Sequence, residues 1–315
     1  MRCQNPRDSN FPDMKKMGRP PIAVFGFIRH EELSKCLSSL ENNEGASEFP
    51  VYIFIDGPRT ESDLEPLKKT CAVASGVWGF KSVEVKFNNR NLGLSNSIRA
   101  GLDSIFKLHD SVIVIEDDLV LHSKFLDFMV IGLEKYSSEK LVASVQGFSL
   151  INQTSDQSYF IQGADCWGWA TWRDRWESIC WDSDALITQI KKSGKTKAFN
   201  FENTYNFMRL LELNSRKEID SWAILWQASM FVQGRVSLYP PFNLVLNDGF
   251  SDDATHTGLA PRNLPLLSTR NSWTYPTKVM MDTGNYEKVV NAYSRFIPKR
   301  HLLRKFKRWL QRIIG

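Results

Sequence analysis

Short apolar segments alternate with helical patterns through the first half of the chain, and this alternation restricts the possible folds more than any other feature. The predicted strands are residues 22–27, 51–55, 83–87, 112–115 and 142–145, and the predicted helices are 31–40, 60–74, 94–108 and 122–136. Val112-Ile-Val-Ile115 is continuous and β-branched, as is typical of a strand covered on both faces. The pattern predicts an α/β fold, a mostly parallel sheet flanked by helices, with ligands at the carboxyl ends of the strands.

The net charge of +5 comes from the C-terminal end of the chain. Eight of the 40 Lys and Arg residues lie between Arg295 and Gly315, where there is no acid, so 32 basic and 35 acidic residues remain elsewhere. A nucleic-acid-binding protein usually carries basic charge across its folded surface. We therefore expect no nucleic-acid partner.

Cysteine usage and hydropathy bear on the compartment. The five cysteines are odd in number and widely spaced, which fits neither a disulfide framework nor a zinc site, so we expect buried, inert thiols. No apolar run approaches the roughly 18–20 residues that span a bilayer. The polar segment 1–20 lacks the apolar core of a signal peptide. These features predict a cytoplasmic protein with a mobile N-terminal segment.

Three consecutive acids, Glu116-Asp117-Asp118, follow the 112–115 strand directly. Carboxylates at the end of a buried strand are costly unless a positive group meets them. Mn²⁺ and Mg²⁺ bind carboxylate and phosphate oxygens together, which makes a divalent cation a natural partner. The alternative is a helix N-terminus carrying acids, which the helix dipole favours.

Residues 22–118, with Asp117-Asp118 as the central acidic motif, resemble the nucleotide-sugar half of GT-A-fold glycosyltransferases. Glu-Asp-Asp followed by Leu119-Val-Leu121 and Phe125-Leu-Asp-Phe128 is most similar to the N-acetylglucosaminyltransferase I-like group and bacterial family 2-like sugar transferases. The resemblance covers roughly residues 21–257. It implies a GT-A-like (Rossmann-like) fold and a metal-dependent, inverting transfer of a sugar from a nucleotide-sugar, favouring a UDP-sugar, to an acceptor hydroxyl.

The same resemblance implies roles for the acidic motif and for residues near it. Asp118 would bind Mn²⁺ or Mg²⁺, Asp117 would lie near the ribose, and Glu116 would lie near the donor sugar as a catalytic candidate. The other expected nucleotide-sugar contacts are Phe27, Arg29, Asp56, Arg90, Asn91 and Asn96. A carboxylate can accept from a pyrimidine N–H, and backbone N–H groups at a helix start suit anions. The alternatives are a turn role for Asp56, a surface cation for Arg29, and a polar cap for residues 88–96, with Ser95 or Asn96 as the cap.

Two positions in the second half are candidates for the remaining chemistry. An inverting transfer needs a carboxylate to take the acceptor proton, and the resembling group uses an Asp immediately before a Trp. That position holds Ser221 here, so Asp220 is the candidate and Glu218 the runner-up. His256 is a candidate metal ligand, because imidazole suits Mn²⁺. The alternatives are that Asp220 is simply an exposed acid and that His256 has a capping or turn role.

Trp167 and Trp169 belong to a dense group of tryptophans in the second half. The group is either a packed aromatic core or a partly open platform on which sugar rings stack. We therefore divide the chain into residues 1–20, a nucleotide-sugar half (21–150), an acceptor-binding half or lobe of the same domain (151–294), and residues 295–315.

Residues 295–315 form a predicted basic amphipathic helix with Trp309 among its apolar residues. This pattern is typical of a helix lying on an anionic membrane surface. It predicts peripheral association with the inner face of the membrane and a glycan or lipid-linked glycan acceptor, as in surface polysaccharide assembly. A dimer-forming helix or a helix docked on the domain is the alternative.

Two rival functions remain open from the sequence. A metal-dependent nucleotidyltransferase or phosphohydrolase could use the same acids. Nucleotidyltransferases, however, usually have a glycine-rich basic loop after the first strand, where this chain has Ile28-Arg-His-Glu-Glu32. A non-enzymatic, membrane-associated nucleotide-binding protein is the second rival, because one fold supports many functions.

Overall fold

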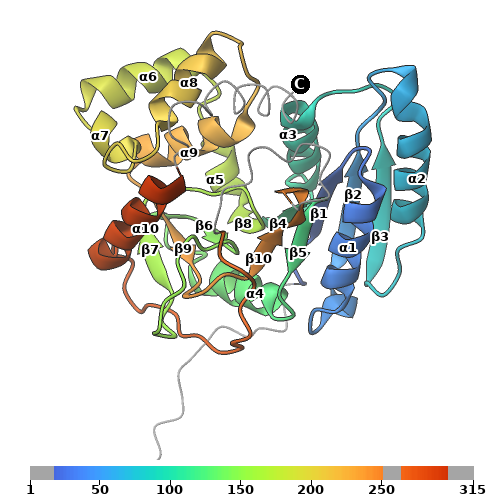
Figure 1. Cartoon of the computed structure of the whole chain (residues 1–315). Coiled ribbons are helices and arrows are strands. Elements are labelled where there is room, and N and C mark those ends of the chain that lie inside the picture. Colours follow the sequence, from blue (N-terminus) through green and yellow to red (C-terminus); the bar gives the residue numbers. More distant parts are fainter. Residues whose placement is uncertain (1–17, 251–263, 297–315) are drawn as a thin grey trace, which may run out of the picture.

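The computed structural model describes residues 18–250 and 264–296, which form one large sheet with helices on both sides (Figure 1). The strands of the large sheet are β1 (Ile22–Gly26), β2 (Pro50–Ile55), β3 (Ser82–Phe87), β4 (Ser111–Glu116), β6 (Val142–Gln146), β7 (Tyr159–Ile161), β8 (Trp169–Trp172) and β9 (Val236–Tyr239). The helices are α1 (His30–Glu41), α2 (Leu64–Ser75), α3 (Leu94–Ile105), α4 (Phe125–Lys135), α5 (Arg173–Glu177), α6 (Ser183–Lys192), α7 (Thr196–Phe199), α8 (Phe207–Ser215), α9 (Trp222–Val232) and α10 (Thr283–Phe296).

The sheet has the order β3-β2-β1-β4-β8-β6-β9-β7 and is mostly parallel. The pairs β3–β2, β2–β1, β1–β4 and β6–β9 are parallel. The strand β8 runs antiparallel between β4 and β6, and β7 is antiparallel to β9. This confirms the α/β class and all five predicted strands, while the antiparallel β8 in the middle of the sheet was not predicted.

Alternating residues of the strands build a separate core on each face of the sheet. Ile22 and Val24 of β1 face a core with α1, α2 and α4, whereas Ala23 and Phe25 face a core with α3, α5 and α9. This is the two-residue period of a strand buried on both faces. The helix α3 approaches especially closely at Gly101, where a Cβ would lie 2.6 Å from the Phe25 ring.

The second half adds a helical group beyond the sheet. Buried side chains of α6, α8 and α9 pack together in a third core, which Figure 1 shows at the upper left. Tyr286, Val289 and Tyr293 of α10 pack with β7 and β9 in a fourth core. This group occupies the region where the sequence predicts an acceptor-binding lobe, and that role stays a prediction.

A small second sheet connects the two halves of the chain. The strand β5 (Leu119–Leu121) follows the acidic motif and pairs antiparallel with β10 (Val245–Asn247). The described residues also contain three 3₁₀ turns: η1 (Ala46–Glu48), η2 (Glu61–Asp63) and η3 (Asp248–Phe250). The helix predicted from residue 60 therefore begins with η2, capped by Thr60, and becomes α-helical at Leu64.

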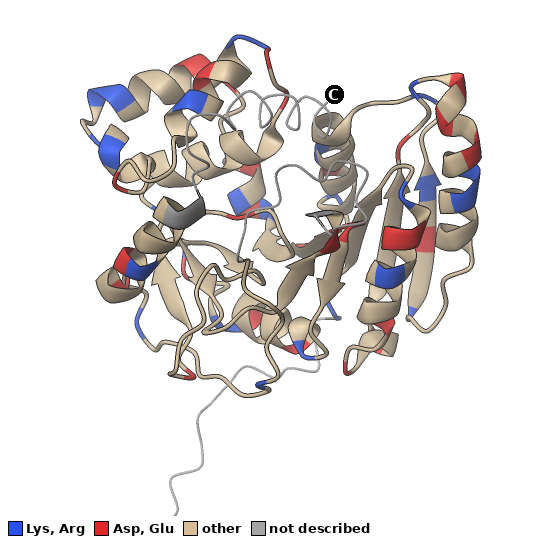
Figure 2. Ribbon diagram, viewed as in Figure 1, with Lys and Arg blue, Asp and Glu red and all other residues tan. Residues whose placement is uncertain are grey.

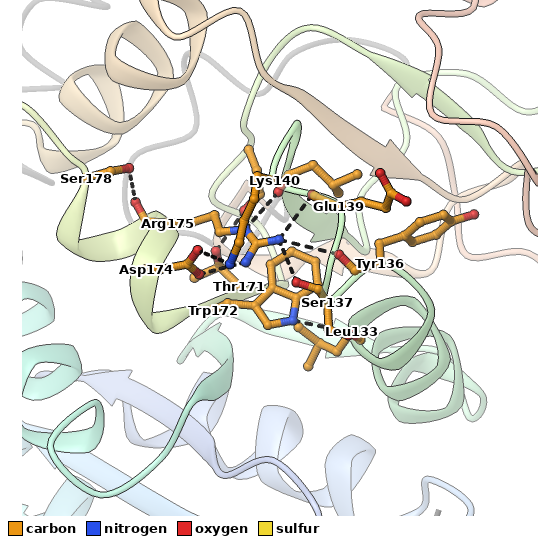
Figure 3. A network of polar contacts seen from close by, with 12 residues as sticks. Leu133, Tyr136, Ser137, Glu139, Lys140, Thr171, Trp172, Asp174, Arg175 and Ser178 are labelled. Atoms are coloured by element: carbon orange, nitrogen blue, oxygen red, sulfur yellow. Dashed lines mark hydrogen bonds and ion pairs between the residues drawn. The ribbon is translucent and has the colours of Figure 1, made fainter. Parts of the chain in front are cut away.

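A buried arginine joins α5 to the turn between α4 and β6 (Figure 3). Arg175 is 1% exposed and donates to the backbone carbonyl oxygens of Tyr136, Ser137, Glu139 and Val142 at 3.0–3.4 Å. Its guanidinium also bonds Asp174 at 2.7 Å and lies 4.3 Å from the Trp172 ring centroid. A planar group with five N–H donors can satisfy several carbonyls at once.

Charged residues of both signs are interspersed on the outer helices, as α1 and α2 show in Figure 2. None of the helices in the described parts of the chain has the length and apolarity that a membrane crossing requires. Arg19, at the end of the segment predicted to be mobile, is exposed; it pairs with Glu48 at 2.7 Å and its guanidinium lies 5.4 Å from the Phe49 ring centroid. The prediction for residues 1–20 stays untested. Residues 297–315, which carry the predicted basic helix, lie outside the described residues.

The cysteines and the start of α3 differ from the predictions. Cys36 is buried, but Cys71, Cys166 and Cys180 are half-buried free thiols, so their predicted burial is wrong. The predicted cap of α3 by Ser95 or Asn96 is also wrong. The cap residue is Gly93 at φ +79°, a conformation that favours glycine, and the Asn96 amide instead bonds the Leu92 carbonyl oxygen.

Candidate functional site

The candidate site lies where the strand order of the sheet reverses direction. From β1 the chain moves outward through β2 and β3, and then returns to place β4 on the other side of β1. Phe25 of β1 is opposite Glu116 of β4, so the two strands end at the same level. Ligands of open α/β sheets bind in the crevice outside such a switch point. The residues that follow β1 and β4 therefore meet there.

The loop after β1 contacts the acidic motif directly. The Asp117 carboxylate accepts a hydrogen bond from the Phe27 backbone N–H at 3.2 Å, and Arg29 Nη1 donates to Asp118 Oδ2 at 2.7 Å. The second Asp118 oxygen, Oδ1, is buried and has no donor among the described residues. The sequence-based alternative of Arg29 as a simple surface cation is therefore wrong.

The acidic motif is electrostatically strained without a further cation. Burial, followed by repulsion from Asp118, raises the pKa of Asp117 to about 7, although Arg29 opposes the shift. Burial and the two neighbouring aspartates also raise the pKa of Glu116, and burial raises that of Asp118. One arginine thus offsets only part of the cost of three adjacent carboxylates.

The residues present fit a divalent cation at Asp118. Its unpartnered Oδ1 is a hard oxygen acceptor in an electronegative setting, as Mn²⁺ and Mg²⁺ prefer. Among residues 18–250 and 264–296, no group of three His, Cys, Asp or Glu side chains is arranged to hold a metal by itself. His256, the other predicted ligand, lies outside the described residues. A cation would thus need ligands beyond the described side chains.

The segment after β10 forms a wall of the site that the sequence did not reveal. Pairing of Asn247 with Leu119 brings residues 247–249 against the acidic motif, and the Asp248 backbone N–H donates to the Asp118 carbonyl oxygen at 2.8 Å. A Cβ on Gly249 would lie 2.4 Å from Asp118 Oδ2. Lys35 of α1 pairs with Asp248 at 2.7 Å. From the sequence, Asn247-Asp-Gly249 indicated only a turn.

Asp56 anchors the loop between β3 and α3. Its buried carboxylate accepts hydrogen bonds from the backbone N–H groups of Gly57, Leu92 and Gly93 and from the Asn88 amide, at 2.9–3.1 Å. Four donors occupy nearly all of a carboxylate's acceptor capacity. The turn role considered from the sequence is thus present, and a direct contact of Asp56 with a nucleotide stays a prediction.

The predicted polar residues of this loop serve mainly to shape it. The Asn91 side chain donates to the Gly57 carbonyl oxygen at 2.9 Å. Gly57 lies so close to the backbone of Arg90 that a Cβ there would be 2.4 Å away, while the Arg90 side chain is exposed. The Arg90 side chain therefore remains available to an anionic ligand. The side chains of Asn91 and Asn96 instead donate hydrogen bonds to backbone carbonyl oxygens.

Phe27 is half-buried beside the acidic motif, and the Arg59 guanidinium lies 4.7 Å from its ring centroid. Arg59 also donates to Asp63 of η2. The predicted nucleotide contact of Phe27 therefore stays open, with Arg59 as a neighbour that the sequence did not single out.

The prediction that Trp167 and Trp169 form an open platform for sugar rings is wrong for Trp169. Trp169 is 0% exposed and stacks between core tryptophans, with ring centroids 5.5 Å from Trp222 and 5.2 Å from Trp226. No face of its ring is open to a sugar. Trp167 is half-buried and packs edge-to-face on Phe148 at 4.7 Å, so its predicted sugar contact stays open.

The predicted base lies at the start of α9. Asp220 is exposed, and Ser221 caps the helix. Trp222 stacks on Trp169, whose strand partner is Val114 of β4, so this helix start lies over the sheet near the end of β4. Glu218, the runner-up, pairs with Arg216 at 3.6 Å. The role of Asp220 stays a prediction.

Asp165 is a further carboxylate near Glu116 that the sequence did not reveal. Because β8 is antiparallel to β4 and Trp169 is opposite Val114, the residues just before Trp169 lie toward the carboxyl end of β4. Asp165 Oδ1 accepts from the backbone N–H groups of Cys166 at 2.7 Å and Trp167 at 3.3 Å. Burial raises its pKa to about 6. Its sequence neighbourhood is aromatic and carries no sign of an active-site acid.

Comparisons with known proteins give only distant matches. No protein-family model matches the chain. No curated protein matches it either. Solved structures that match include TarS from S. aureus, at 15% identity and a TM-score of 0.28, with 40% of this chain and 20% of TarS covered. The chain thus spans a fifth of that structure.

Two further structural matches cover more of this chain. The mannosyltransferase PcManGT from Pyrobaculum calidifontis, in complex with GDP-Man and Mn²⁺, matches at 8% identity and a TM-score of 0.38, with 69% of each chain covered. The active-site mutant Q189E of LgtC matches at 14% identity and a TM-score of 0.31, covering 54% of this chain and 64% of LgtC. Likenesses this distant assign no function to the chain.

Proposed function

We propose that this protein is a GT-A-like glycosyltransferase that moves a sugar from a nucleotide-sugar to an acceptor hydroxyl. The observation that carries the proposal is the position of Glu116, Asp117 and Asp118 at the switch point between β1 and β4. An acidic cluster there, facing Arg29 and with one buried oxygen unpartnered, suits the diphosphate and cation of a nucleotide-sugar.

The chain's own residues would bind the donor from three sides of the site. Asp117, held by the Phe27 N–H, faces the ribose, Glu116 faces the sugar, and Arg29 is placed to exchange part of its pairing with Asp118 for the diphosphate. Asp118, with His256, would hold Mn²⁺ or Mg²⁺. That cation, when bound, supplies positive charge to the leaving diphosphate. Phe27, Arg90 and the loop anchored by Asp56 complete the nucleotide site.

An inverting transfer is a single displacement at the anomeric carbon. The acceptor oxygen forms the new bond as the bond to the diphosphate oxygen breaks, and the bonding electrons leave with the diphosphate. The acceptor proton passes to a carboxylate, for which we propose Asp220, at the start of α9, with Glu218 as runner-up.

The acceptor and the location extend the same proposal. The helical group of residues 151–294 would bind a glycan or lipid-linked glycan, with Trp167 as a sugar contact. The basic segment 295–315 would attach the protein to the inner, anionic face of the membrane. Loss of anionic-vesicle binding on truncation before Pro298 tests this part, and undiminished binding would refute it.

A thermal-shift panel tests the donor site. UDP, GDP, dTDP and CMP are each measured with and without Mn²⁺, on wild type, Asp118→Asn and the exposed-aspartate control Asp127→Asn. Saturation at about 100 times the dissociation constant stabilises by roughly 2.7 kcal/mol. We expect one nucleotide to shift wild type and the control only with Mn²⁺, and Asp118→Asn to lose the shift. No shift with any nucleotide would refute the proposed donor site.

A product assay separates transfer from hydrolysis. The nucleotide-sugar of the class found in the panel is incubated with the enzyme, and the released nucleotide and sugar are measured with and without added glycan acceptors. Acceptor-dependent nucleotide release is expected for a transferase. Release of free sugar or phosphate at a rate that no acceptor changes would instead support the phosphohydrolase.

A further inference from the structure

The outer edge of β3 is a surface that the proposed donor site does not explain. β3 is the last strand at the end of the large sheet opposite β7, and among the described residues only β2 pairs with it (Figure 1). Its register with β2 runs from Ser82 to Phe87 without a bulge, and the strand contains no proline. Edge strands that stay unpaired are commonly very short, bulged or interrupted by proline. The backbone of β3 is therefore regular enough to accept a further strand.

Alternate residues of β3 direct their backbone N–H and C=O groups away from β2. The Asn88 N–H donates to the Ile55 carbonyl oxygen at 3.0 Å, so the even-numbered residues of the strand face β2. Pro50, which is opposite Ser82, has no N–H to donate, in agreement with this alternation. Lys81 precedes the strand and also donates to the backbone before β2, so the alternation holds from Ser82 onward. The residues whose backbone groups face outward are therefore Val83, Val85 and Phe87.

Two side chains of opposite charge lie on one face of this edge. Glu84 is exposed and Lys86 is half-buried, and the two pair with each other at 3.3 Å. Lys86 Nζ also lies 5.5 Å from the ring centroids of Tyr52 and Phe54, which places it over the neighbouring strand β2. Charged side chains on a sheet edge usually oppose pairing with another strand. Whether they oppose it here depends on which charges the second strand brings opposite them.

A second copy of β3 matches these charges when the pairing is centred on Val85. Two copies related by a twofold axis pair such edges antiparallel, with their outward-facing residues opposite one another. Centring on Glu84 would set two glutamates opposite each other, and centring on Lys86 would set two lysines opposite each other, both of which are unfavourable. Centring on Val85 instead sets each Glu84 opposite Lys86 of the other copy. The edge is thus complementary to itself in charge.

We propose that the outer edge of β3 is a dimer interface, at which a second copy of this chain adds its own β3 antiparallel and centred on Val85. The two Val85 residues exchange backbone hydrogen bonds, Val83 of each copy pairs with Phe87 of the other, and Glu84 forms an ion pair with Lys86 on the opposite face. The two large sheets then form one continuous sheet. This proposal does not depend on the proposed transferase activity.

Exposed aromatic side chains near both ends of β3 fit the same arrangement. Phe87, the last residue of the strand, is 47% exposed, and Trp78, four residues before the strand, is 78% exposed. Because the two copies run antiparallel, each end of the interface brings the Trp78 end of one copy toward the Phe87 end of the other. Large aromatic side chains are enriched at protein interfaces relative to the rest of the surface. The dimer therefore gives these side chains a place to pack.

Charge exchange, followed by sedimentation velocity over a concentration series of the full chain, tests the interface. The variants are Glu84→Lys, Lys86→Glu and the double variant with both changes. Glu134→Lys, an exposed glutamate on α4, is the matched control. Either single change turns both opposite-charge pairs across the interface into like-charge pairs, whereas the double change restores them with exchanged signs. Thermal unfolding checks that each variant is folded, and Glu84→Lys, at an exposed position, decides alone if Lys86→Glu does not fold.

We expect wild type and the control to dimerise with the same dissociation constant, and each single variant to dimerise at least about tenfold more weakly. The double variant should dimerise more strongly than either single variant. An equimolar mixture of Glu84→Lys with Lys86→Glu should form a heterodimer, because each pair across the interface then joins opposite charges. That last result cannot arise from a loss of folding.

Several results would overturn the proposal. A wild type that remains monomeric throughout the concentration series has no such interface. A dimer that Glu84→Lys leaves unchanged associates through another surface. If both single variants are folded but their mixture does not associate, the register centred on Val85 is wrong. None of these results bears on the nucleotide panel, so the dimer and the donor site are refuted separately.

Discussion

Replacing Arg175 should destabilise this protein more than any exposed charge change, because its buried guanidinium bonds four backbone carbonyl oxygens of one turn. Two of these, the carbonyls of Tyr136 and Glu139, also accept from a backbone N–H. Arg175→Met removes hydrogen bonds to four backbone carbonyl oxygens of residues 136–142 and the contact with Trp172. Asp174 keeps Lys140 as its partner at 2.6 Å, so the carboxylate is not left without a cation. The loss therefore falls mainly on the buried carbonyls.

The magnitude follows from those carbonyls. A buried polar group left without a partner costs about 1–3 kcal/mol, although relaxation and water recover part of this for several neighbouring groups. Because the carbonyls of Tyr136 and Glu139 keep a backbone N–H donor, the cost falls mainly on those of Ser137 and Val142, and we expect Arg175→Met to lose about 2–4 kcal/mol of unfolding free energy. Arg175→Lys keeps the charge but loses the planar fork, so it should recover less than half of the loss.

Urea denaturation measures the effect, with Arg173→Met as the matched control. Arg173 is on the same helix and bonds the His109 carbonyl oxygen and Asp110, but its side chain is 37% exposed. The control should lose about 1 kcal/mol or less. A midpoint shift for Arg175→Met no larger than for Arg173→Met, at an unchanged denaturant slope, would refute the importance of the network.

Three further perturbations test the site. Gly249→Ala places a Cβ against Asp118 Oδ2 and should abolish the nucleotide shift with Mn²⁺, whereas Gly284→Ala, whose Cβ has ordinary contacts, should leave it intact. Asp56→Ala leaves the N–H groups of Leu92 and Gly93 without acceptors and should cost about 2–4 kcal/mol in urea unfolding; a loss below 1 kcal/mol would contradict the anchor. Asp165 has a folded pKa of about 6, above its ordinary value near 3.9, so the folded state binds its proton more tightly and stability falls as pH rises between these values. The unfolding free energy of Asp165→Asn should therefore rise by about 1–3 kcal/mol relative to that of wild type between pH 4 and pH 8. Equal dependence of the two unfolding free energies on pH would contradict the raised pKa of Asp165.

Local patterns predicted the strands and most helices because those elements are buried on one or two regular faces. Val112 to Ile115 is apolar at every position, and the structure covers it on both sides. The place of the acidic motif was also predicted, because its three acids directly follow this strand in the sequence. The sequence allowed us to expect Arg29 near Asp118, because β1 and β4 end at one edge of the sheet. The ion pair between them could be recognised only once the β1–β4 register was known.

Contacts made over long sequence distances could not be predicted in the same way. The strand β10 has three residues, and only its pairing with β5 places Gly249 against Asp118. Asp165 precedes β8, and it lies toward the end of β4 only because β8 runs antiparallel to β4. The sequence has no local signal for that direction. Periodicity also cannot distinguish a buried Trp169 from an exposed one, since both readings use the same residue spacing.

The position of β8 between β4 and β6 has a consequence for synthesis on the ribosome. β4 emerges before its neighbour β8 exists, so its apolar edge remains unpaired until residues 169–172 have been made, and the wall at Gly249 arrives later still. An open apolar strand edge invites pairing with other chains. A nascent chain of this protein should therefore depend on chaperone protection, or on slow release, over the stretch between residues 116 and 172.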